Sequence, residues 1–125
     1  MPRWGFFSGN ANLSNTVREL MEDTNHNHQK FISIASAWEM AIKQGKGKLT
    51  LSFPLETYIT QKLNLEDFEL LSIQLNHLAI ISTLPFYHND PFHRLLIAQA
   101  IVENIPIMSR DAAFDDYYQV KRIWD

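Results

Sequence analysis

Residues 88–100 read His-Asn-Asp-Pro-Phe-His-Arg-Leu-Leu-Ile-Ala-Gln-Ala, and the prediction of the fold begins with this stretch. Asp90 is a favourable N-cap, because its carboxylate can accept the free backbone N–H groups of a first helical turn. Pro91 suits the first helical position, where it has no hydrogen bond to lose. The residues that follow are apolar on nearly every side, which predicts a buried helix that ends at Asn104. Polar side chains therefore gather at the electropositive end of a buried helix, where we expect the function.

The composition predicts a single globular domain over residues 1–125. Hydrophobic residues make up 46% of the chain and charged residues 20%, which are ordinary values for such a domain. The chain has no cysteine, which excludes disulfides and thiolate metal sites and fits a reducing compartment. No apolar run reaches the length of a membrane span, so we expect a cytoplasmic protein with no membrane partner. The net charge of −3 does not favour a nucleic-acid binder, which would need a local basic patch.

The order of elements predicts an α/β fold with a parallel sheet between layers of helices, because strand patterns alternate with helical ones. Strands are expected at residues 31–34, 68–73, 106–109 and 120–124. Helices are expected at 14–22 with Ser14 as the cap, at 37–44 with Ser36 as the cap, at 54–63 and at 74–84. In the last of these helices the periodicity predicts that Leu75, Leu78, Ala79 and Ile81 face the core.

Three acidic residues occupy positions where sites form in α/β sheets, beyond the carboxyl ends of parallel strands. Asp111 directly follows a strand, Asp90 opens a helix that should begin at the same edge, and Glu39 lies in a helix that follows a strand. Converging carboxylates repel one another unless a divalent cation lies between them. Mg²⁺ or Mn²⁺ held in this way can orient water for phosphodiester cleavage. Each residue alone is better explained by capping or by solvation, so only the combination is informative.

The motifs together resemble the PIN-domain family, and within it the VapC-type toxins of bacterial toxin–antitoxin pairs. The resemblance is carried by residues 31–49 (FISIASAWEMAIKQGKGKL), residues 88–100 and residues 109–114 (SRDAAF), and it runs from about Trp4 to Trp124. It implies a three-layer α/β/α fold with a mostly parallel sheet, a Mg²⁺-dependent endoribonuclease that cuts RNA, and a cognate antitoxin as partner. It also implies that Glu39 is the helix glutamate of the acidic site and Asp111 the acid after the late strand.

The chain departs from this family pattern at two places. The family begins with a central strand that ends in an aspartate, whereas no acid precedes Glu19 here. We therefore expect the first, central strand and its aspartate to be absent, either because the start codon is placed too late or because the gene is a remnant. The branch usually reads Asp-Pro-Phe-Asp-Arg, whereas this chain has His93 at the second aspartate. Asp90 and His93 share a helix face and could bind one ion, although a hydrogen bond near the first turn explains His93 equally well.

Basic residues near the acids could contact substrate phosphate. Arg94 and Arg110 flank them, and Lys43 is a weaker candidate, because basic residues at the end of the helix at 37–44 also complement its dipole. A zinc hydrolase built on His88, Asp90 and His93 is a minor alternative, because a clear third histidine is lacking and His77 lies on another helix. Trp38 is expected to be a core or interface anchor.

The leading prediction is a metal-dependent endoribonuclease with Mg²⁺ or Mn²⁺ as cofactor. Its catalytic and metal-binding residues are Glu39, Asp90 and Asp111, with His93 as an additional candidate ligand. The alternative is a degenerate PIN-like module that binds an antitoxin or RNA without cutting it, which the missing acids favour. The sequence does not identify the RNA target or the antitoxin, and it does not decide whether the chain forms a homodimer.

Overall fold

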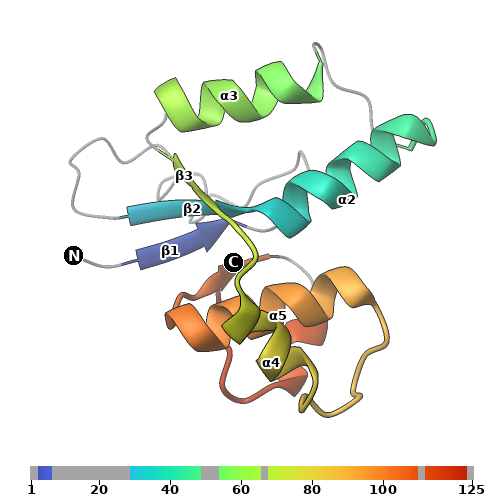
Figure 1. Ribbon diagram of the computed structural model, residues 1–125, viewed down its shortest axis with the longest axis vertical. Helices are drawn as coiled ribbons and strands as arrows, with labels where there is room; N and C mark the ends of the chain where they lie inside the picture. Colours follow the sequence, from blue (N-terminus) through green and yellow to red (C-terminus); the bar gives the residue numbers. More distant parts are fainter. Residues whose placement is uncertain (1–2, 7–28, 49–53, 66–67, 110–111, 124–125) are drawn as a thin grey trace.

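Five parallel strands form one sheet at the centre of the molecule (Figure 1). The computed structural model describes residues 3–6, 29–48, 54–65, 68–109 and 112–123, and all structural statements concern these residues. The strands are β1 (Arg3–Phe6), β2 (Gln29–Ser33), β3 (Phe68–Leu71), β4 (Ile107–Met108) and β5 (Arg122–Ile123). Their order across the sheet is β3-β2-β1-β4-β5. The predicted parallel sheet is therefore confirmed.

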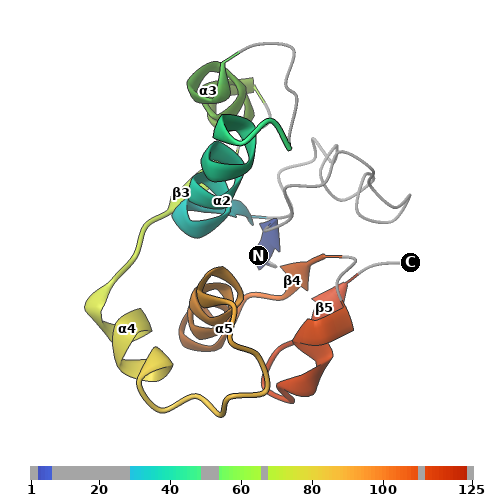
Figure 2. The same ribbon diagram turned by 90° about the vertical axis from the view of Figure 1, so that its right-hand side faces the viewer.

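Helices lie on both sides of this sheet, which confirms the predicted α/β/α class. They are α2 (Ile34–Gly45), α3 (Leu55–Leu65), α4 (Leu75–Ile81), α5 (Pro91–Glu103) and the short 3₁₀ helix η1 (Ala112–Asp116). The views in Figures 1 and 2 place α3 on one side of the sheet and α4 with α5 on the other. The predicted helix over residues 14–22 lies outside the described residues. Within the described part of the chain, no helix is long and apolar enough to cross a membrane.

The prediction that the central strand is absent is wrong. β1 occupies the middle of the sheet and pairs with β2 on one side and β4 on the other. Gly5 lies opposite Phe31 in the first pairing and opposite Ile107 in the second. The strand is only four residues long and reads Arg-Trp-Gly-Phe, which is too short to show a strand pattern in the sequence. It contains no acidic residue, so β1 offers no carboxylate to a site.

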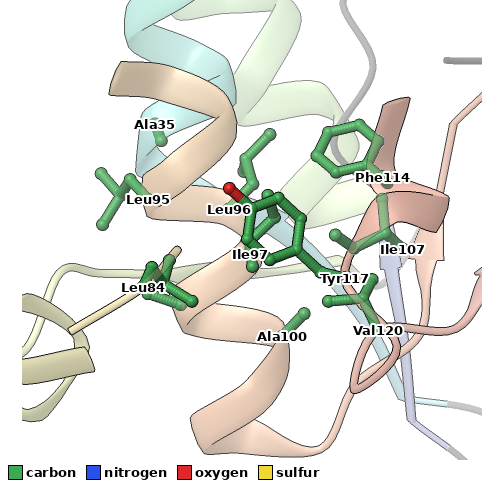
Figure 3. Packing of buried hydrophobic residues seen from close by; sticks show 11 residues of the cluster. Ala35, Leu84, Leu95, Leu96, Ile97, Ala100, Ile107, Phe114, Tyr117 and Val120 are labelled. Atoms are coloured by element: carbon green, nitrogen blue, oxygen red, sulfur yellow. The ribbon is translucent and has the colours of Figure 1, made fainter. Parts of the chain in front are cut away.

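α5 is the buried helix that the sequence predicts, and its two ends lie where expected. The Asp90 carboxylate oxygen Oδ1 accepts hydrogen bonds from the backbone N–H groups of Phe92 (2.9 Å) and His93 (3.3 Å). At the other end Asn104 adopts the left-handed conformation with φ 55° and caps the helix. Every residue from 94 to 100 is buried. In Figure 3 the side chains of α5 pack with others that follow η1, such as Tyr117 and Val120.

α2 begins earlier than predicted, directly at the end of β2. Ser33 is its N-cap, and the hydroxyl oxygen accepts a hydrogen bond from Ala35 N at 3.0 Å. Ser36, the predicted cap, is instead buried within the first turns of the helix. The β2 strand therefore passes into α2 without an intervening loop. The sequence has serine at both 33 and 36, so the presence of a serine does not by itself show at which residue the helix begins.

The predicted inward face of α4 is wrong for Leu75, Leu78 and Ala79, whereas Ile81 packs against the core as predicted. Leu75 is 84% exposed and Leu78 is 48% exposed, and Ala79 is exposed as well. His77 is fully buried, and its Nε2 lies 3.0 Å from a carboxylate oxygen of Glu103 on α5. Burying a histidine without a hydrogen-bond partner costs free energy. The pairing of His77 with Glu103 therefore fixes which side of the short helix faces α5.

Candidate metal centre

Three side chains meet where the N-terminal end of α5 faces α2. Glu39 of α2, the N-cap Asp90 and His93 of α5 each offer one ligand atom, and these atoms all lie within 4.8 Å of one another. Ligands on opposite sides of one divalent ion are about 4–5 Å apart, because each metal–oxygen bond is about 2.0–2.6 Å long. The three donors therefore fit one ion with little movement. They form the one such group found among the described residues.

Contacts between α2 and α5 hold these side chains together. The ring of Trp38, next to Glu39 in the chain, packs edge-on against the ring of Phe92, next to His93, at a centroid distance of 4.8 Å. Trp38 is 57% exposed, so it joins the two helices near the surface and does not lie in the core. Glu39 directly follows Trp38, and His93 directly follows Phe92. The contact between the two rings therefore keeps Glu39 of α2 close to His93 of α5.

A buried polar contact joins the same two helices farther from the cluster. Gln99 of α5 is fully buried, and its side-chain carbonyl accepts a hydrogen bond from the hydroxyl of Ser33 at the start of α2. Its amide nitrogen donates to the backbone carbonyl of Ser72 at 3.3 Å. Gln99 thus ties the beginning of α2 and the segment after β3 to α5.

Replacing Gln99 with leucine should therefore destabilise the fold. The change leaves the buried Ser33 hydroxyl without its acceptor, which costs about 1–3 kcal/mol, whereas water can replace the bond to the carbonyl of the exposed Ser72. We expect the free energy of unfolding, measured by urea titration, to fall by about 2 kcal/mol. The matched control is Gln61→Leu on the exposed face of α3, which should change stability by no more than about 0.5 kcal/mol. Equal shifts for the two variants would contradict this role of Gln99.

The Asp90 carboxylate can serve the helix and a cation at the same time. One oxygen, Oδ1, receives both capping hydrogen bonds. A carboxylate has a second oxygen with its own lone pairs, and the side chain is exposed. Capping and metal binding are thus compatible for Asp90, and the sequence alone could not separate them.

The His93 ring is held by an aromatic neighbour. Its centroid lies 4.9 Å from that of Phe114, with 52° between the ring planes. Phe114 belongs to η1 and is only 2% exposed, so its ring is held by the core and packs against the imidazole. This contact restricts the ring orientation at the cluster. The ligand role that the sequence suggested for His93 therefore has the geometry that it needs.

Lys43 is the basic side chain that the structure places beside the cluster. Its ammonium nitrogen lies 3.5 Å from Glu39 Oε1, one helical turn away, and the lysine side chain is 48% exposed. An exposed pair of this kind contributes little to stability. Its effect is local, because it adds a mobile positive charge next to the carboxylates.

Arg94 has contacts that favour a structural role over the predicted phosphate contact. The residue is only 6% exposed, and its guanidinium lies 4.0 Å from the centroid of the Phe86 ring. The guanidinium donates to four backbone carbonyls, those of Ile81, Leu84, Pro85 and His88. These bonds hold the end of α4 and the loop after it against α5, and they take up the donors that a phosphate would need.

Asp111 and Arg110 lie outside the described residues, so the structure does not place these two predicted site residues. The acids just after them have other partners. Asp115 forms two hydrogen bonds of 3.0 Å with the Arg122 guanidinium, which lowers the pKa of this carboxyl. Asp116 lies 3.2 Å from the ring nitrogen Nε2 of His88.

His88 and His77, the other histidines considered for a zinc site, do not join the cluster. The Nε2 of His88 lies 2.6 Å from the carbonyl oxygen of Ala113, on the side of η1. His77 is buried against Glu103 in the contact between α4 and α5. Of the three residues in that hypothesis, Asp90 and His93 come together and His88 does not.

The architecture and the cluster define an α/β/α domain with a carboxylate–histidine site between two helices. The PIN-domain model matches residues 5–120, and the chain belongs to this family. A chain in the crystal structure of VapBC2 from Rickettsia felis bound to a DNA fragment from their promoter has a similar fold, with a TM-score of 0.60. The two are 18% identical, and the match covers 88% of this chain and 83% of that one. No curated protein matches the sequence.

Proposed function

We propose that this protein is a metal-dependent endoribonuclease of the VapC toxin type. The observation that carries the proposal is the meeting of Glu39, Asp90 and His93 within 4.8 Å, in a chain of the PIN-domain family. Mg²⁺ or Mn²⁺ bound there would lower the pKa of a bound water and offset the negative charge that develops on a phosphodiester during cleavage. The residues present fit such an ion, because carboxylate oxygens are its preferred ligands.

The side chains of the cluster have separate tasks in this proposal. Asp90 is fixed by its capping bonds and holds the ion in place. Glu39 is partly buried on the facing helix, where it can bind the ion or accept a proton from the attacking water. Asp111, which follows β4 in the sequence, remains the proposed third acid.

Positive charge near the cluster supports the binding of RNA phosphates. Lys43 is already beside Glu39, and its flexible ammonium can move to a phosphate oxygen with little loss, because exposed ion pairs are weak. Arg110, next to Asp111 in the sequence, is the second proposed phosphate contact. Arg94 is left out, because its donors are bound to backbone carbonyls.

We also propose an antitoxin as the protein partner, in the cytoplasm. Large apolar side chains on the surface support a protein partner, because exposed apolar patches often mark interfaces. Leu75, Phe86 and Tyr87 are 84%, 77% and 59% exposed, and all three come from α4 and the loop that follows it. The same surface would suit a second copy of the chain, so a homodimer remains part of the proposal.

A second candidate function is a PIN-like module that binds RNA or an antitoxin without cutting. It is favoured by the absence of acidic residues in β1 and by an imidazole, in place of a carboxylate, at residue 93. Each missing carboxylate reduces the negative charge that holds a hard cation. The two candidates make opposite predictions for RNA cleavage.

Cleavage of a structured RNA in the presence of Mn²⁺ or Mg²⁺ separates these functions. We expect cleavage that EDTA abolishes and that added metal restores. The matched control is Glu39→Gln, purified in the same way, which keeps the size of the side chain and removes its charge. Equal cleavage by Glu39→Gln would indicate a contaminating nuclease, and RNA binding without cleavage would support the non-catalytic module.

A further inference from the structure

The candidate metal site contains a nitrogen donor, the imidazole of His93, and this donor changes which ions the site should bind. We propose that the site selects a first-row transition ion, Mn²⁺ or Co²⁺, over Mg²⁺, with His93 as a direct ligand. The inference rests on the proposed metal site and adds the identity of its ion. It starts from the donor set of Glu39, Asp90 and His93, which is two carboxylates and one imidazole.

The chemistry of this donor set favours transition metals. Mg²⁺ is small, prefers oxygen ligands and requires a nearly ideal octahedron. Imidazole suits softer ions, and the affinity of mixed nitrogen and oxygen sites rises along the first transition row. An oxygen-only site would lose part of this discrimination. Two carboxylates also balance the charge of a divalent ion when the imidazole is neutral.

The position of His93 makes direct ligation geometrically sound. Asp90 and His93 are three residues apart at the start of α5, so their side chains lie on one face of the helix. Phe114 packs against the imidazole ring at a centroid distance of 4.9 Å and limits its rotation. Glu39 approaches from α2, which is held to α5 by the contact between Trp38 and Phe92. The three ligands therefore come from two helices whose separation is fixed.

Metal binding to the whole protein without RNA tests the proposal. Titration of Mn²⁺ followed by electron paramagnetic resonance, with Mg²⁺ as competitor, gives the ratio of the two affinities. We expect wild-type protein to prefer Mn²⁺ by about tenfold or more. His93→Asp should make the site all-oxygen and reduce this ratio severalfold. An acidic residue in the first turn also suits the helix dipole, so the variant should fold.

Direct ligation has a signature that a structural role of His93 would not produce. Pulsed resonance of the bound Mn²⁺ should show coupling to an imidazole ¹⁴N in wild-type protein and in the control His88→Gln. The coupling should be lost in His93→Asp and in His93→Asn. The proposal is overturned if wild-type protein shows no ¹⁴N coupling, if His93→Asp leaves the Mn²⁺ to Mg²⁺ ratio unchanged, or if folded protein binds neither ion.

The outcome for selectivity is separable from the outcome for ribonuclease activity. Mn²⁺ binding through His93 without RNA cleavage would remove the nuclease proposal and leave the metal preference. Cleavage supported equally by Mg²⁺ and Mn²⁺, with equal affinities for the two ions, would remove the preference and leave the nuclease.

Discussion

Replacing Arg94 with methionine is expected to lower the free energy of unfolding by about 2–4 kcal/mol, because the buried carbonyl of Leu84 and three partly buried carbonyl contacts lose a charged donor. The guanidinium makes four hydrogen bonds of 3.0 to 3.5 Å to backbone carbonyls of the α4 end and the following loop. Methionine fills similar space and supplies no donor. Urea titration measures the change.

Two further variants test the reason for this loss. Arg94→Lys keeps the charge but has a single ammonium that cannot reach all four carbonyls, so it should recover only part of the stability. Arg122→Met removes the ion pair with the half-exposed Asp115 and one hydrogen bond to the carbonyl of Ser109, so the loss should be smaller, about 1–2 kcal/mol. If Arg94→Met were as mild as Arg122→Met, the phosphate role of Arg94 would return to consideration.

Asp90→Asn is expected to reduce RNA cleavage by about 100-fold or more, equivalent to about 2.7 kcal/mol in the activation barrier. The amide oxygen of asparagine is as good an N-cap as a carboxylate, so stability should hardly change. The amide carries no charge, so the affinity for Mn²⁺ should fall as well. Steady-state cleavage rates and metal titrations on the same preparation measure both effects.

Asp90→Ala provides the comparison that separates the two tasks of this residue. It should lose cleavage to the same degree and also about 1 kcal/mol of stability, because the cap is removed. Asp116→Asn, which changes an acid outside the cluster, should leave cleavage within a few-fold of wild type. Full cleavage by Asp90→Asn would show that Asp90 is a cap only.

The parts of the molecule that could be predicted from sequence are those whose signals are local. Asp90 and Pro91 mark the start of α5 and Asn104 marks its end. Each of these residues stabilises only the helical turn next to it, so the sequence alone shows where the helix begins and ends. The approach of Glu39 to Asp90 follows from the order of strands and helices in a parallel fold. For His93, helical spacing alone did not distinguish a ligand from a residue that caps the turn, and the structure adds that its ring lies within 4.8 Å of the two carboxylates.

The parts that could not be predicted depend on contacts between distant segments. β1 has only four residues, and it is a strand because its backbone pairs with β2 on one side and with β4 on the other. The inward face of α4 is set by the pairing of His77 with Glu103, which are 26 residues apart. In the sequence, Arg94 comes shortly after Asp90 and His93, and it therefore looks like an exposed residue of the candidate site. Only the folded chain shows that its partners are carbonyls of the segment before α5.

The central position of β1 has a consequence for synthesis. Gly5 and Phe6 emerge early from the ribosome, yet one of their two neighbouring strands, at Ile107 and Met108, is translated about a hundred residues later. The β1 edge that faces β4 therefore stays unpaired until residues 107–108 have been translated, and an incomplete nascent chain exposes this edge. The pairing of β1 with β4 is therefore expected to form late in folding.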